Sequence, residues 1–84
     1  MGQIGQRFRL KSPSMGTVLQ QDGKKIVFQI PEGSEIVAID PIPEQLSKDL
    51  LRKVNIQWQG RTMTMFLVDV QERGTRIQAA QKGL

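Results

Sequence analysis

Apolar and polar residues alternate most regularly along residues 54–66, "VNIQWQGRTMTMF". Gln59-Gly60 separates two runs of this alternation and can form a two-residue turn, so the pattern predicts a β-hairpin. In that hairpin every pair except Trp58 with Arg61 matches apolar with apolar or polar with polar, and a shift of one residue would break all of these matches. The predicted opposite pairs are Trp58 with Arg61, Gln57 with Thr62, Ile56 with Met63, Asn55 with Thr64 and Val54 with Met65.

A second hairpin is predicted within residues 17–30, "TVLQQDGKKIVFQI". Asp22-Gly23 supplies the positive φ angles of a type I′ turn, and β-prone runs flank it on both sides. The resulting register places the apolar residues Leu19, Ile26 and Phe28 on one face, which we expect to face the core. The predicted pairs are Gln21 with Lys24, Leu19 with Ile26 and Thr17 with Phe28.

The next segment predicts a turn, a short strand and a helix. Pro31 and Gly33 fit a turn before a strand at residues 35–39, and two further prolines exclude a central strand directly after it. The leucines that follow recur at helical spacing, so we predict a short amphipathic helix at about residues 44–52. These leucines are Leu46, Leu50 and Leu51.

Near the end of the chain, Asp69 and Glu72 have the spacing of a capping box and Gly74 can end a helical turn, predicted at residues 69–73. A last short strand centred on Ile77 follows. At the other end, residues 1–15 lack a clear period and are predicted to be a flexible basic arm, although Phe8 and Leu10 allow a short edge strand. We therefore expect one domain over residues 16–80 and a tail over 81–84.

Five or six short antiparallel strands with tight turns predict a mainly β domain, a small SH3-like, partly open β-barrel. The alternative is an α+β domain in which the helix at 44–52 covers one face of an antiparallel sheet. The motifs Val54-x-x-x-Trp58-x-Gly60-Arg61 and Met65-Phe66-x-x-Asp69-x-x-x-Arg73-Gly74 follow a Pro-x-Gly turn. In these motifs the chain resembles a group of small bacterial hypothetical proteins of unknown function, a resemblance that implies a compact β domain and no activity.

The charge of this 84-residue chain is concentrated near its beginning. Residues 1–25 carry five basic side chains and one acidic side chain, which accounts for the whole net charge of +4, whereas seven basic and seven acidic side chains cancel over residues 26–84. A basic segment of this kind is typical of a solubilising tail, and it can also bind phosphate backbones.

The chain contains no histidine, no cysteine and no tyrosine, so it lacks the commonest general base and the strongest nucleophile. No serine lies in a nucleophile elbow and no glycine-rich phosphate loop is present. We therefore expect no enzymatic activity, no metal and no cofactor. The chain also lacks an apolar run long enough to span a bilayer, and we expect a cytoplasmic protein without membrane insertion.

Two functions agree with this composition. The first is a small interaction or regulatory module that binds another protein, or self-associates to a homodimer, by strand addition at an open sheet edge. The alternative is a nucleic-acid-binding module that stacks bases on an aromatic residue beside basic side chains. Trp58 is expected to belong mainly to the core and less to a contact surface. The candidate partner-binding residues are Trp58, Arg61, Arg7, Arg9, Lys11, Lys24 and Lys25.

Overall fold

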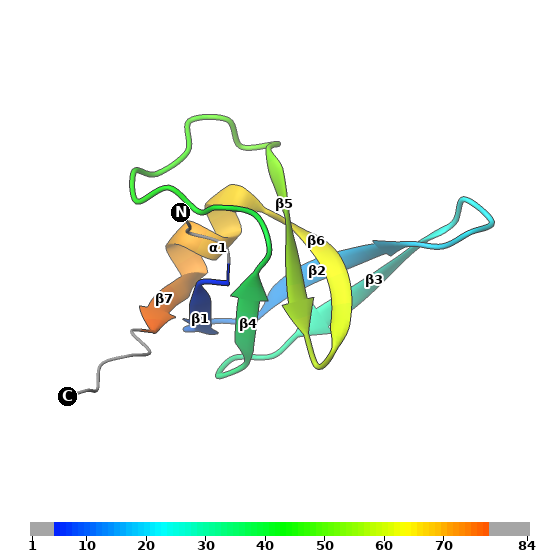
Figure 1. Cartoon of the computed structure of the whole chain (residues 1–84), viewed down its shortest axis with the longest axis horizontal. Helices are drawn as coiled ribbons and strands as arrows, with labels where there is room; N and C mark the ends of the chain where they lie inside the picture. Colours follow the sequence, from blue (N-terminus) through cyan, green and yellow to red (C-terminus); the bar gives the residue numbers. More distant parts are fainter. Residues whose placement is uncertain (1–4, 78–84) are drawn as a thin grey trace.

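Short strands joined by tight turns dominate the chain, and one short helix, α1 (Leu67–Arg73), follows the sixth strand. The computed structural model describes residues 5–77 (Figure 1). The strands are β1 (Arg7–Leu10), β2 (Ser14–Leu19), β3 (Lys25–Ile30), β4 (Glu35–Ala38), β5 (Lys53–Trp58), β6 (Arg61–Phe66) and β7 (Gly74–Ile77).

All seven strands form one antiparallel sheet in the order β3-β2-β6-β5-β4-β1-β7. Residues from five strands, the helix and the segment after β4 share one buried apolar cluster, so the sheet curls around it. Within the described residues, strands β3 and β7 end the sheet, which leaves the barrel open. The predicted class, a small, mainly β, partly open barrel, is confirmed, with seven strands instead of five or six. The core consists of Phe8, Leu10, Ile30, Ile36, Ala38, Ile42, Val54, Ile56, Met63, Met65, Leu67 and Val70.

The β5–β6 hairpin has the register that the alternation predicts. Gln59 and Gly60 adopt φ angles of 54° and 76°, the positive values that a type I′ turn needs. All five predicted pairs are present, and the ladder extends to Lys53 opposite Phe66. The inward residues Val54, Ile56, Met63 and Met65 are buried because they pack in the apolar core, and β4 and β2 pair with the two edges of the hairpin.

The β2–β3 hairpin forms, but the predicted register is wrong by one residue. The N–H of Gln20 donates to Lys24 O (2.8 Å), and the N–H of Gly23 donates to Gln20 O (3.0 Å). Gly23, with φ of 87°, thus ends a three-residue loop with a bulge, not a two-residue turn. The extra loop residue shifts every pair, so that Leu19 faces Lys25, Val18 faces Ile26, Thr17 faces Val27 and Gly16 faces Phe28.

Residues 41–52 form an irregular loop between β4 and β5, so the prediction of a helix at 44–52 is wrong. Local contacts take the place of helical ones: Ser47 Oγ accepts from the N–H of Asp49 (3.1 Å), and Asp49 Oδ1 accepts from the N–H of Leu51 (3.0 Å). Leu51 is 76% exposed, so the predicted apolar face does not pack on the sheet. The alternative α+β architecture is wrong for the same reason.

The helical turn predicted before the last strand is confirmed, with a different beginning. Helix α1 starts at Leu67 and has no side-chain cap, so Asp69 and Glu72 do not form the predicted capping box. Gly74 ends the helix, as predicted, and its N–H donates to Val70 O. Its backbone is extended, and a Cβ there would lie 2.6 Å from Val70 O, so the missing side chain permits this close approach.

The predicted flexible arm over residues 1–15 requires correction, because most of this segment belongs to the sheet. Strand β1 pairs with β4 on one side and β7 on the other, and Phe8 and Leu10 are buried. Strand β2 then begins at Ser14. Residues 1–4 of the predicted arm, the end of the predicted last strand and the predicted tail over 81–84 lie outside the described residues.

Candidate functional site

The β2–β3 hairpin extends away from the rest of the barrel, at the opposite end of the molecule from β7 (Figure 1). Its base belongs to the core, since Ser14 and Ile30 are buried. Burial decreases toward the turn, where Leu19 and Lys25 are both exposed. A segment that leaves the core in this way exposes backbone and side chains that the rest of the sheet buries.

Strand β3 is the end of the sheet, and among residues 5–77 it pairs with β2 alone. The hydrogen bond from Gln20 to Lys24 sets the phase of the ladder, because hydrogen-bonded pairs recur at every second residue of an antiparallel pair. The backbone groups of Ile26, Phe28 and Ile30 therefore point toward β2. Those of the other three residues, Lys25, Val27 and Gln29, point outward from the free edge.

The same phase is visible on the other side of β2. Thr17 lies opposite Val27, so its backbone groups point away from β3. Its carbonyl oxygen indeed accepts a hydrogen bond from Thr64 Oγ1 on β6 (3.2 Å). The hydrogen bond from Gln20 to Lys24 and the hydrogen bond from Thr64 to Thr17 thus agree on which backbone groups of β2 point toward β3 and which point toward β6.

The outer face of the hairpin carries apolar side chains that no other described element covers. Met15 is 60% exposed, Leu19 67% and Val27 58%. Phe66, on the neighbouring strand β6, is also partly exposed, and Lys53 Nζ lies 5.6 Å from its ring centre. We call Met15, Leu19 and Val27 the outer apolar face of the hairpin.

On the inner face of the hairpin, Val18 and Phe28 pack against the core from its margin. Trp58 packs there as well and is half-buried. The guanidinium of Arg61 lies 4.8 Å from the ring centre of Phe28, within the range of a cation–π contact. Arg61 thus covers Phe28, a contact that the pairing of Arg61 with Trp58 alone did not indicate.

The basic candidates of the first 25 residues separate into two groups. Arg7 and Arg9 project from β1 and both bind Glu35, with distances of 2.8 Å to Oε1 and 2.9 Å to Oε2. These hydrogen bonds lower the pKa of the Glu35 carboxyl below its usual value. Lys24 and Lys25 lie at the other end of the sheet order, on β3 and its turn, so the two groups do not form one basic surface. Lys11 directly follows β1.

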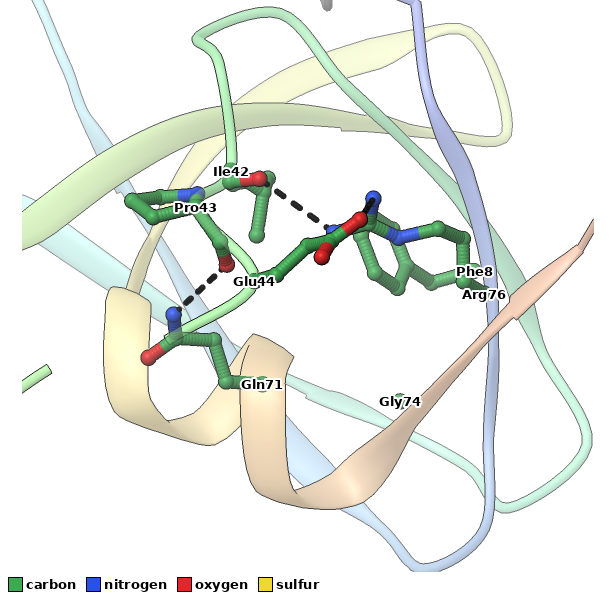
Figure 2. Close-up of a pocket in the computed structure, with 7 residues that line it drawn as sticks. All are labelled: Phe8, Ile42, Pro43, Glu44, Gln71, Gly74 and Arg76. Atoms are coloured by element: carbon green, nitrogen blue, oxygen red, sulfur yellow. Dashed lines mark hydrogen bonds and ion pairs between the residues drawn. The ribbon is translucent and has the colours of Figure 1, made fainter. Parts of the chain in front are cut away.

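A cleft of about 250 Å³ lies between α1, β7 and the loop after β4 (Figure 2). Gln71 on α1 holds this loop: its Nε2 donates to Pro43 O (2.9 Å) and Gln45 O (2.8 Å), and its Oε1 accepts from the N–H of Ser47 (2.8 Å). The amide of Gln71 is therefore occupied by the protein's own backbone.

Arg76, on β7, closes the other side of this cleft. Its guanidinium donates to Ile42 O (3.2 Å), lies 3.8 Å from the Glu44 carboxylate and stacks over the ring of Phe8, as Figure 2 shows. The polar side chains of the cleft thus fasten the loop to the barrel. This arrangement indicates a structural role for the cleft and leaves the hairpin edge as the stronger candidate site.

Two further properties concern the described part of the chain. Residues 5–77 contain no group of three or more acidic side chains that could hold a metal ion. No helix within these residues is long and apolar enough to cross a membrane.

No family model, no curated protein and no solved structure matches the chain. The resemblance to small bacterial hypothetical proteins therefore stays a prediction. The residues of the hairpin edge were not among those selected from the sequence, apart from Lys25. The sequence indicated this edge only through apolar residues on both faces of one hairpin, Val18 and Val27 included. A sheet with one solvated face does not require such a pattern.

Proposed function

We propose that the chain is a non-catalytic interaction module, an SH3-like barrel that binds a partner protein by strand addition at the free edge of β3. A helical turn between the last two strands is typical of SH3-like barrels, and here α1 separates β6 from β7, which returns to pair with β1. The absence of histidine and cysteine from the sequence supports a binding role over catalysis. We expect this role to be exercised in the cytoplasm.

The observation that carries the proposal is the unprotected edge of β3. Proteins usually block a free edge with proline, a bulge within the strand, or several charges. Strand β3 contains no proline, pairs with β2 over six consecutive residues without a bulge, and carries Lys25 as its one charge. An edge with outward N–H and C=O groups beside an apolar face suits strand addition, in which main-chain hydrogen bonds supply affinity.

The nucleic-acid alternative has less support. Arg7 and Arg9 share one carboxylate, which reduces their attraction for phosphate, and Arg61 lies over Phe28. Electrostatic binding predicts retention of random DNA or RNA at about 50 mM salt and steep loss as salt increases. Retention of that kind, unchanged by substitutions in β3, would favour the nucleic-acid function over the one proposed here.

A photo-crosslinking residue at position 29 tests the proposal in the native host. Gln29 lies on the free edge, so we expect covalent adducts with a partner, whereas the same residue at the exposed position Gln57 on the central strand β5 should give few. The decisive control is Val27→Pro, which removes an outward N–H while leaving the β2–β3 ladder its hydrogen bonds. Adducts at position 29 should disappear in this variant; adducts that persist would contradict strand addition at β3.

A further inference from the structure

We propose that the segment bound at this edge is β3 of a second copy of the chain, in an antiparallel pair with a two-fold axis through Val27. This inference rests on the proposed function, and it names both the occupant and the register. It follows from the phase of the β2–β3 ladder, from the residues on the free edge and from the charges at the two ends of β3.

Symmetry limits the possible registers to five. In an antiparallel pair, residues directly opposite each other have their side chains on the same face and, in hydrogen-bonded pairs, exchange N–H and C=O groups. Opposite residues must both have outward groups or both lack them, so along the edge from Lys25 to Gln29 the two-fold axis can pass through any one of residues 25 to 29. The axis fixes every other pair across the interface.

Four of the five registers are unfavourable. An axis through Ile26 places Gln29 opposite Gly23 in the turn, and an axis through Phe28 places Lys25 opposite Pro31, so each pairs only two of the three outward residues with outward residues of the second copy. An axis through Lys25 would place two ammonium groups directly opposite each other, and like charges in that position are destabilising. An axis through Gln29 would place Pro31 opposite Val27 of the second copy, and proline has no N–H to donate. An axis through Val27 avoids these problems and pairs all three outward residues of each strand: Val27 faces Val27 of the second copy, and Lys25 faces Gln29 of the second copy.

The Val27 register also unites apolar side chains on both faces of the joined sheet. On the outer face, the half-exposed Val27 side chains of the two copies meet at the axis. On the inner face, Ile26 lies opposite Phe28 of the second copy, and Ile26 is exposed at the free edge of the single chain. Cross-strand pairs of β-branched and aromatic residues are among those that stabilise sheets.

The charges around β3 favour antiparallel pairing with an identical strand. Lys24 and Lys25 stand at the beginning of the strand, and Glu32 follows its end in the exposed turn before β4. Asp22 also lies at this end, but Lys24 and Lys25 outnumber it, so antiparallel pairing brings an end with net positive charge toward the acidic residue after the end of the other strand, twice by symmetry. The edge is therefore complementary to itself, which is the property that a two-fold interface requires.

Opposite charges introduced at the axis provide the test. Val27→Lys and Val27→Glu each place like charges opposite each other in a symmetric pair, while an equimolar mixture places Lys opposite Glu. By sedimentation velocity we expect wild-type protein to form dimers as its concentration rises. Each variant alone should have a dimer dissociation constant at least about tenfold higher than that of the wild type. The equimolar mixture should form heterodimers. The exposed control Gln57→Lys should associate like the wild type.

Amide hydrogen exchange gives a second readout that does not depend on the variants. The amides of Lys25, Val27 and Gln29 should exchange fast in dilute protein and more slowly as concentration rises, whereas those of Ile26, Phe28 and Ile30 should be protected throughout. A dimer that tolerates like charges at position 27, or that leaves the first three amides unprotected, would use another surface and overturn the inference.

The two proposals fail in different ways. A protein that stays monomeric at millimolar concentration, yet gives position-29 adducts with a different protein that Val27→Pro abolishes, overturns self-pairing and retains strand addition. A monomer without such adducts contradicts both proposals. Adducts whose mass equals two copies of the chain, sensitive to Val27→Pro, support both.

Discussion

The two long hairpins have strands of equal length and opposite surroundings. β5–β6 lies in the middle of the sheet, between β4 and β2, and its inward residues, such as Ile56, are buried. β2–β3 lies at one end, where β3 has no further partner among residues 5–77 and Val27 is exposed. Position in the sheet, more than local sequence, thus decides which hairpin stabilises the core and which remains open to a partner.

The largest difference in stability between the two hairpins should appear when a central residue of each is truncated to alanine. Ile56→Ala should lower the free energy of unfolding by about 2 to 5 kcal/mol, because a fully buried side chain leaves a cavity. Val27→Ala, measured in dilute protein, should lower it by at most about 1 kcal/mol, since the side chain is already half in solvent. Urea denaturation measures both values. Equal losses would contradict the distinction between a central and a peripheral hairpin.

Gly16→Ala tests the contact between the two hairpins. A Cβ at Gly16 on β2 would overlap the buried Met63 side chain of β6, with Cγ only 2.9 Å away. We expect a loss of about 1 to 3 kcal/mol from overpacking. The same substitution in a Met63→Ala background, which lacks both the Cγ and the sulfur, provides the control: a smaller loss there would place the strain at this contact. No loss on Gly16→Ala would mean that the two hairpins do not pack closely there.

The turn glycines distinguish global from local unfolding. Gly60 and Gly23 both have positive φ, so alanine at either site is strained by about 1 kcal/mol. Gly60→Ala should reduce the global stability by that amount. Gly23→Ala should reduce it by less than half as much, and instead speed amide exchange at Gln20, whose N–H closes the loop. Similar global losses from the two variants would show that the hairpin turn unfolds only together with the core.

The smallest effect concerns turn chemistry. Gln59→Asn should raise stability by a few tenths of a kcal/mol, because asparagine tolerates the positive φ of 54° better than glutamine. Gln21→Asn should leave stability unchanged, since position 21 does not have positive φ. Thermal denaturation monitored by Trp58 fluorescence can compare the two variants. A gain at both positions would remove the distinction between the two types of turn.

The alternation of residues predicted the β5–β6 hairpin to the residue, because one register alone matches apolar to apolar on the inner face. The β2–β3 hairpin lacked this information: Val18, Leu19, Ile26 and Val27 are apolar on both faces, so only the turn could set its register. Asp22-Gly23 fits both a two-residue turn and a three-residue loop with a bulge, and the chain adopts the second.

The prediction of a helix at 44–52 was wrong for another reason. Leucine spacing was compatible with a helix, but local hydrogen bonds of Ser47 and Asp49 and the anchoring amide of Gln71 hold the segment as a loop.

The free edge of β3 could not be predicted from the sequence either. Which strand ends a sheet depends on long-range pairings that no local pattern contains; here β2 pairs with β6 on its other side, which leaves β3 at the end.

The pairing of β1 with β7 has a consequence for how the protein is made. Arg7 lies opposite Ile77, seventy positions later in the chain, so β1 is synthesised well before its second neighbour exists. Until β7 leaves the ribosome, one edge of β1 has no strand to pair with. The two hairpins can form during synthesis, since their contacts are local, whereas the closing of the sheet at β1 must wait for translation to pass residue 77.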